Sequence, residues 1–221
     1  MERAAEALGQ WLGSIFEWSE EEREIAAFSL TLIFWSVFFL TLLILLSLLF
    51  GVVTEAVAMV FTSGLLRTFA GGAHLSSGWR CGVVLAVIAT AVALGAHYAA
   101  PLIAPDLGYA LAAATLALAV GVTTVMAKYA PVDVPEKPIT SDGQRRRLRT
   151  VSIVIPLAWG CAAVIALLAV GPGAELAGTT LGAAWVASSI GLLWETLTVV
   201  PPGIRFVCWL DGQLGRIALS K

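Results

Sequence analysis

Charged residues are scarce in this chain, and their scarcity excludes an ordinary soluble domain. Lysine, arginine, aspartate and glutamate make up 13% of the 221 residues, whereas 59% are hydrophobic and the mean hydropathy is +0.90. A soluble domain of this length could not bury so much apolar side chain, so most of it should face lipid. The sequence therefore predicts an integral membrane protein and gives no reason to expect a nucleic-acid partner.

The chain also lacks the residue patterns of a disulfide framework or a metal centre. Its three cysteines, Cys81, Cys161 and Cys208, are odd in number and include no CxxC pair, which suits a reducing compartment for at least some of them. A zinc site built from His74, Cys81 and Cys208 would lack clustered ligand spacing. We therefore expect no metal and no cofactor.

Long apolar runs divide the chain into membrane crossings. Four runs have about 20 residues each, the length that crosses roughly 30 Å of hydrocarbon at about 1.5 Å per residue. They are residues 82–104, 107–127, 151–171 and 176–200. An earlier run, residues 25–66, holds one charged residue and is long enough for two crossings turned near Gly51, or for one crossing followed by an interfacial helix. We expect two crossings there.

The fold class that follows is all-α: a polytopic membrane protein with about six transmembrane helices and both ends on the same side. Five crossings with the amino terminus on the other side is the alternative. Apolar residues at helical spacing in residues 8–16 predict an amphipathic helix on the membrane surface, and Ser19 with Glu22 predicts a capping box at the next helix. The expected divisions are an amino-terminal arm (1–24), a transmembrane domain (25–204) and a carboxy-terminal tail (205–221).

Basic residues lie on one side of this predicted topology. Beyond residue 24 there are eleven lysines and arginines, and all of them fall in segments 67–80, 128–149 and 205–221. The loops of the opposite side, "APLIAPDLGY" and "GPGAE", contain none. The positive-inside rule therefore places the three basic segments in the cytoplasm.

Residues 67–81, "RTFAGGAHLSSGWRC", interrupt the apolar runs and hold His74 and Cys81. Cys81 lies at the predicted start of a helix, where the helix dipole, Arg80 and a protonated His74 all favour the reactive thiolate. His74 could act first as its ion-pair partner or base and then as the acid that protonates a leaving amine. In an uninterrupted helix the two residues would lie about 10.5 Å apart along the axis, so the chain must bend, and we expect the bend at Gly78.

Other polar positions near this stretch have more than one interpretation. Gly71 and Gly72 could bring backbone N–H groups close to a developing oxyanion. Arg67 could anchor a helix at the lipid headgroups or bind a substrate carboxylate. Glu55 and Glu195 are acids within or near the membrane, and either could orient the histidine.

The stretch resembles the signature of the accessory gene regulator B family, AgrB. In that signature an arginine precedes Gly-Gly-x-His, and a cysteine follows the histidine seven positions on. The matching positions here are Arg67, Gly71, Gly72, His74 and Cys81. A second patch, "YAPVDVPEKPI" at 129–139 with the following "RRRLR", resembles the family's loop between two membrane helices. Ala73 departs from the aromatic residue expected before the histidine, which concerns substrate fit more than chemistry.

The resemblance implies a cysteine endopeptidase of the bacterial cell membrane, usually a homodimer, with a catalytic pocket that faces the cytoplasm. Its substrate would be a short amphipathic signal propeptide of quorum sensing, AgrD-like. Cys81 would be the nucleophile and His74 its base, with Arg67, Gly71 and Gly72 as substrate-binding or oxyanion-binding positions. The amino-terminal part of the propeptide would form a thioester on the enzyme, and the substrate's own cysteine would then attack it to give a cyclic thiolactone.

Two other functions fit the sequence. One is a transporter or exporter of a small peptide, with the intramembrane acids along its path, although no inverted internal repeat is visible. The other is a non-catalytic membrane scaffold whose Cys81 is a redox or acylation site.

The remaining polar positions have simpler interpretations. The "RRRLR" cluster indicates topology and contact with lipid phosphates, with docking of an acidic propeptide tail as the alternative. His97 and Cys161 are expected to be packing residues and Pro156 a kink.

Overall fold

The computed structural model describes residues 2–103, 108–133, 139–170 and 179–219. Within these ranges the chain is helical and has no strand. The helices are α1 (Glu2–Ile15), α2 (Glu20–Leu49), α3 (Val53–Ala70), α4 (Gly78–Ala99), the 3-10 helix η1 (Ala100–Leu102), α5 (Gly108–Tyr129), α6 (Asp142–Val170), α7 (Thr180–Val199) and α8 (Pro201–Leu219). The predicted all-α membrane fold is confirmed.

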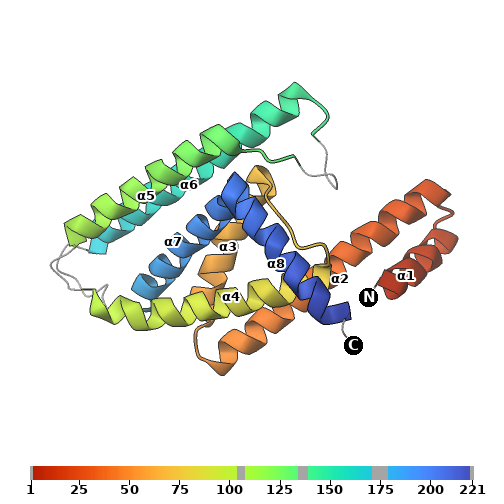
Figure 1. Ribbon diagram of the computed structural model, residues 1–221, viewed down its shortest axis with the longest axis horizontal. Helices are drawn as coiled ribbons and strands as arrows, with labels where there is room; N and C mark the ends of the chain where they lie inside the picture. The colour runs from red at the N-terminus through yellow and green to blue at the C-terminus, as the bar shows by residue number, and fades with distance from the viewer. Residues whose placement is uncertain (1, 104–107, 134–138, 171–178, 220–221) are drawn as a thin grey trace.

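The amino-terminal arm is helical, and it folds back along the start of α2 (Figure 1). Gly9 allows this close approach, because a Cβ there would lie 3.2 Å from Ala27. The Ser19 side chain accepts a hydrogen bond from the Glu22 backbone, and the Glu22 carboxylate accepts one from the Ser19 backbone. The predicted capping box is therefore confirmed.

The long apolar run of residues 25–66 forms two helices, as the sequence predicted. α2 ends at Leu49, Gly51 adopts a φ of 69°, and α3 begins at Val53. A φ of this sign suits glycine because it has no Cβ, so the turn falls where the sequence expected it. Five helices of the described chain are long and apolar enough to cross a membrane, and the bent pair of α7 and α8 makes up to six.

Two helices depart from their predicted bounds. α6 begins at Asp142 rather than at 151, because the basic cluster continues the helix out of the apolar span instead of preceding it. α8 meets α7 at an angle of 88°, so residues 205–219 form a helix that runs across the end of α7. Gly203 permits the sharp corner, since a Cβ there would overlap the Leu197 carbonyl. The divisions at residues 24 and 204 remain predictions.

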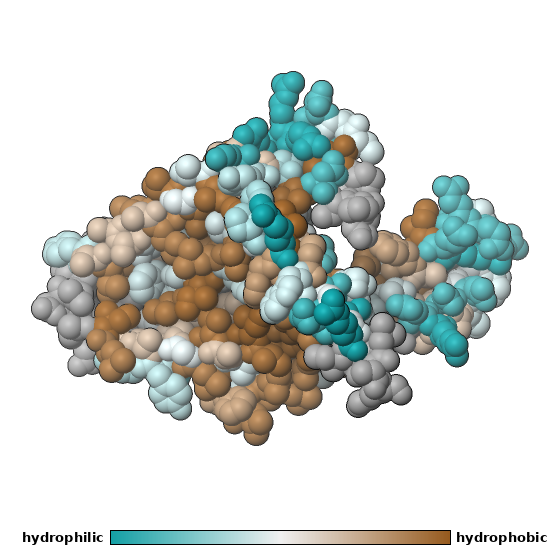
Figure 2. All heavy atoms as spheres, viewed as in Figure 1, coloured by the Kyte–Doolittle hydropathy of each residue, from teal (hydrophilic) through white to brown (hydrophobic). Residues whose placement is uncertain are grey.

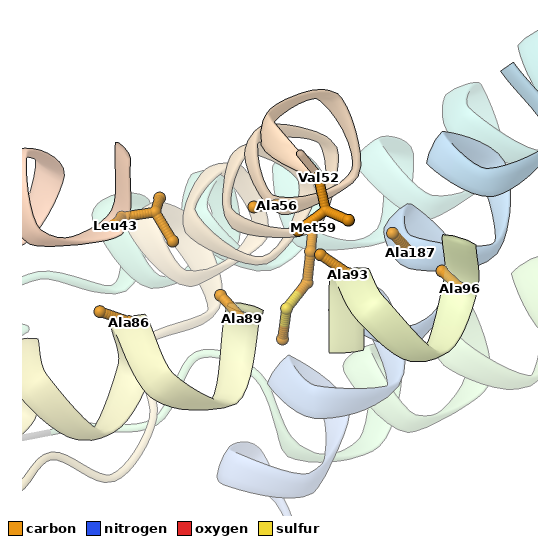
Figure 3. Packing of buried hydrophobic residues seen from close by; sticks show 9 residues of the cluster. All are labelled: Leu43, Val52, Ala56, Met59, Ala86, Ala89, Ala93, Ala96 and Ala187. Carbon is orange, nitrogen blue, oxygen red and sulfur yellow. The ribbon is translucent and has the colours of Figure 1, made fainter. Parts of the chain in front are cut away.

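Small residues bring α3, α4 and α7 close together. Ala86, Ala89, Ala93 and Ala96 form one stripe of α4 that faces α3, and Ala187 of α7 joins them (Figure 3). The contact of α7 with α3 is equally close, because a Cβ on Gly191 would lie 2.5 Å from the Met59 carbonyl. Such small-residue interfaces are typical of helices that pack within lipid, where close van der Waals contact replaces the hydrophobic effect.

The outer surface agrees with a membrane environment. Figure 2 shows hydrophobic side chains over the middle of the visible face and hydrophilic ones towards its upper and right edges. In Figure 1 these edges hold the junction of α5 and α6 and the pair of α1 with the start of α2. Exposed apolar side chains such as Leu40, Leu45, Val120 and Ile165 lie on these helices, as expected for lipid contact.

Candidate active site at the end of helix α3

Helix α3 ends at Ala70 because two glycines follow it in backbone conformations that other residues rarely adopt. Gly71 has a φ of 71° and Gly72 a φ of 134°. Both are also tightly packed: a Cβ on Gly71 would lie 2.6 Å from the Val132 carbonyl oxygen, and one on Gly72 would lie 2.6 Å from the Thr198 hydroxyl. The pair therefore shapes the loop that carries His74, and a role in oxyanion binding stays a prediction.

The break between His74 and Cys81 is wider than the single bend expected at Gly78. The chain leaves the helix at Gly71 and re-enters one at Gly78, with Ser77 as the N-cap residue. Gly78 has a different role, since a Cβ there would lie 2.9 Å from the Trp35 ring of α2. The break therefore begins at Gly71 and ends at Gly78, whereas the sequence predicted a bend at Gly78 alone.

Arg67 lies at the centre of the polar contacts at this end of α3. Its Nη1 is 3.1 Å and 3.4 Å from the two carboxylate oxygens of Glu195 on α7, and 3.3 Å from the Thr198 hydroxyl. Its Nη2 donates to the Ala73 carbonyl and lies 3.0 Å from Nδ1 of His74. The Arg67 side chain is 24% exposed and that of Glu195 1%. Arg67 thus has a buried carboxylate partner within the chain, which the sequence did not reveal.

Backbone contacts hold the histidine loop between two other elements. The Ala73 N–H donates to the Thr198 carbonyl at the end of α7, at 3.0 Å. The Val132 N–H donates to the Ala70 carbonyl at 2.8 Å, which ties the segment after α5 to the end of α3. Lys128 and the basic start of α6 therefore lie at the same end of the helices as His74 (Figure 1).

Cys81 lies in the first turn of α4, close to the positive end of the helix dipole. Its N–H donates to the Ser77 carbonyl at 3.0 Å, and its side chain is half-buried and forms no disulfide. It lines a pocket of about 160 Å³ together with Arg67 and Ala73. The rest of the lining comes mainly from apolar residues of α2, α3, α4, α7 and α8, among them Phe39, Val60, Leu85, Trp194, Val207 and Leu210.

Arg80, expected to favour the thiolate of Cys81, is engaged elsewhere. Its Nη1 is 3.1 Å from the Asp211 carboxylate of α8, and its Nη2 is 3.1 Å from the Ser76 hydroxyl. Both charged side chains are less than one-fifth exposed. The ion pair holds α8 over the start of α4.

Of the two intramembrane acids, only Glu195 lies at the histidine end of α3. Glu55, in the first turn of α3, is 3% exposed and lies 2.9 Å from Nδ1 of His97 on α4. His97 therefore has a polar partner instead of the packing role expected of it, and its side chain is 50% exposed. The sequence did not distinguish Glu55 from Glu195 as the acid that could orient His74, and the structure places only Glu195 near it.

The basic cluster after α5 is partly engaged within the chain. Arg145 is 3.1 Å from the Asp133 carboxylate, and Arg149 donates to the Ala127 carbonyl. Residues 134–138 of the second family-like patch, with Lys137 and Pro138, lie outside the described residues. Arg146 and Arg147 are exposed, in agreement with a surface that meets water or lipid phosphates.

Comparison with known proteins gives a consistent result. Residues 2–199 match the family described as Accessory gene regulator B. AgrB-like protein 2 of Clostridium perfringens strain 13 is 22% identical over 161 residues, which cover 70% of this chain and 72% of the relative. An AgrB-like protein of C. perfringens strain SM101 is 20% identical over 217 residues, which cover 98% and 99%. No solved structure matches the chain. Because the family match spans nearly all of the helices and includes the Arg67–Cys81 stretch, this chain belongs to the accessory gene regulator B family.

Proposed function

We propose that this protein is a membrane-embedded cysteine endopeptidase that cleaves a quorum-sensing propeptide and promotes its cyclisation to a thiolactone. Family membership supports a role in the agr quorum-sensing system, and the family is associated with processing of the AgrD propeptide. The observation that carries the proposal is the position of Arg67: it lines the Cys81 pocket and also contacts His74.

The first half of the reaction forms an acyl-enzyme. The Cys81 sulfur, once its proton has passed to His74, attacks the scissile carbonyl carbon and its π electrons move to the oxygen. The carbonyl re-forms as the C–N bond breaks, and His74 returns the proton to the leaving amine. The carboxy-terminal fragment departs with a free amino group, and the amino-terminal part remains as a thioester on Cys81.

The second half transfers the acyl group within the substrate. The substrate's own cysteine loses its proton to His74 and attacks the thioester carbonyl, which releases Cys81 and closes the thiolactone. One thioester replaces another, so the acyl group stays activated, whereas attack by water would give a linear acid. The apolar lining of the pocket supports this outcome because it disfavours water near the thioester.

The location and assembly belong to the same proposal. We place the Cys81 pocket at the cytoplasmic side of a bacterial cell membrane, because Lys128 and Arg145 lie at the same end of the helices. We also propose an AgrD-like propeptide as the partner and a homodimer as the assembly. Labelling of single-cysteine variants in sealed vesicles tests the orientation: Cys81 should react only with a reagent that reaches the cytoplasmic side.

The direct test uses an amphipathic peptide with a central cysteine and an acidic carboxy terminus, taken from a neighbouring short reading frame. Incubation with the purified protein in liposomes should give a cyclic product lighter than the linear acid by one water molecule, and none with His74→Ala. Cleavage that persists in both His74→Ala and Cys81→Ser would rule out the proposal. Flux of intact peptide into the liposomes without cleavage would instead support a transporter.

A further inference from the structure

The Arg67 guanidinium determines where the proton of His74 can lie. A guanidinium carries only donors, so the contact of Nη2 with Nδ1 of His74, at 3.0 Å, requires Nδ1 to accept. A neutral imidazole with an accepting Nδ1 has its proton on Nε2. The imidazolium, with protons on both nitrogens, would turn an N–H towards a cationic N–H. The contact therefore favours one tautomer of the ring, with the proton on Nε2.

Glu195 fixes the guanidinium in this position. Its buried carboxylate bonds to Nη1, while Nη2 faces the Ala73 carbonyl and the imidazole. Thr198, one turn along α7, adds a third acceptor for Nη1 at 3.3 Å. Because a buried arginine without a counterion is costly, the guanidinium should stay with the carboxylate even when its bond to the imidazole breaks.

From these contacts we propose that Glu195 is a positioning residue that acts through Arg67 to set the tautomer of His74. The basic lone pair of the ring is then on Nδ1, where it accepts the Arg67 N–H, and a proton from Cys81 has to displace that N–H to reach it. The proton leaves sulfur and joins Nδ1, while the Arg67 hydrogen bond to Nδ1 is lost and its bond to Glu195 remains. Glu195 thus holds the guanidinium that keeps the ring in this tautomer.

The inference extends the proposed function, but its main test requires no substrate. The chain has two histidines, so protein labelled with ¹³C and ¹⁵N in histidine gives two sets of imidazole signals, and a His74→Gln variant assigns them. The wild-type His74 signals should be those of the neutral ring with its proton on Nε2. Glu195→Gln removes the anchor of the guanidinium and should replace this single set with the signals of both neutral tautomers.

The second histidine supplies a matched control within the same molecule. Glu55→Gln removes the other buried carboxylate and should change only the His97 signals, because Glu55 lies beside His97. In the Glu195→Gln variant, unchanged His97 signals show that the helices are still folded. Unchanged His74 signals in that folded variant would overturn the inference.

A second variant separates positioning from simple anchoring of the helix. Lysine at position 67 keeps the charge that pairs with Glu195, but its single ammonium lacks the planar fork that serves Glu195 and His74 together. Arg67→Lys should therefore mix the tautomers of His74, whereas an anchoring role alone would leave them unchanged.

The kinetics of peptide cleavage give a further measurement. Glu195→Gln should also lower kcat about tenfold with little change in KM. If the signals respond but no peptide is cleaved in wild type, the proposed function fails and the positioning role stands.

Discussion

A buried glutamate lies near a histidine at each of the two ends of helix α3, but the residues around the two pairs differ. At its start Glu55 meets His97, and at its end Glu195 of α7 lies two contacts away from His74. The first pair is a direct bond with a half-exposed imidazole. In the second, an arginine stands between the acid and the histidine, and the same arginine lines a pocket with a cysteine.

The difference shows what turns a buried polar pair into a candidate site. A carboxylate and an imidazole 2.9 Å apart satisfy each other and can hold α3 against α4 without further chemistry. At the other end the carboxylate bonds to the arginine, and the arginine in turn contacts the histidine. Glycines that end the helix and an apolar pocket lined by Cys81 occur at this end.

The largest expected difference concerns the cysteines. Cys81→Ser should lower the rate of peptide cleavage by at least about a thousandfold, because a serine in this position is a far weaker nucleophile than a thiolate. Cys161→Ser on α6 is the matched control and should leave the rate unchanged, since Cys161 is exposed and does not line the pocket. Product formation is followed by mass spectrometry. Equal loss in both variants would contradict the assignment of the nucleophile.

Removing each buried acid should give the next largest difference. Glu195→Ala leaves Arg67 without a counterion and should lower the free energy of unfolding by about 3 kcal/mol. Glu55→Ala should cost less, about 1 kcal/mol, because its partner His97 is half-exposed and can be solvated. Thermal unfolding in detergent measures both. If Glu55→Ala were the more damaging change, the start of α3 would be the more important end for stability.

Alanine substitutions of two glycines, one near each histidine, should have opposite effects on stability. Gly72→Ala should destabilise the protein by about 2 kcal/mol and impair cleavage, because its φ of 134° and the 2.6 Å approach to Thr198 leave no room for a Cβ. Gly95→Ala, in α4 near His97, meets nothing within 4 Å and should stabilise the helix by up to about 1 kcal/mol. Circular dichroism during heating distinguishes them. A harmless Gly72→Ala would mean that the loop does not need its observed conformation.

The smallest effect is expected at His97. Its imidazole is 50% exposed, so His97→Gln should change the free energy of unfolding by less than about 1 kcal/mol and leave cleavage unchanged. His74→Gln should abolish cleavage with a similarly small effect on stability. A kinetic assay beside the unfolding measurement tests both. Loss of cleavage in His97→Gln would show that the two ends of α3 are coupled.

Much of the architecture could be predicted because membrane helices are encoded locally. Apolar run length found α2, α4, α5 and α7 to within a few residues, and Ser19 with Glu22 found a helix start. Where an apolar run is extended by polar residues, as at the start of α6, hydropathy alone could not find the boundary. A basic residue that faces water does not prevent helix formation, so the helix continued past the edge of the span.

The candidate site was only partly predictable because its key contact is distant in sequence. Arg67, His74 and Cys81 were visible as a local cluster, whereas Glu195 belongs to a helix more than 100 positions away. In the sequence Glu195 is visible only as an isolated acid in an apolar run, and Glu55 has the same feature. Only the packing of α7 against α3 distinguishes them, and this packing depends on small residues such as Gly191.

In the proposed reaction Cys81 carries the acyl group. The most direct measurement is the intact mass of the purified protein, quenched in acid soon after mixing with the propeptide, followed by peptide mapping. We expect a thioester adduct of the propeptide's amino-terminal part on Cys81, which disappears in Cys81→Ser and on treatment with hydroxylamine. Cleaved peptide with no adduct, or with the adduct on Cys161 or Cys208, would contradict it.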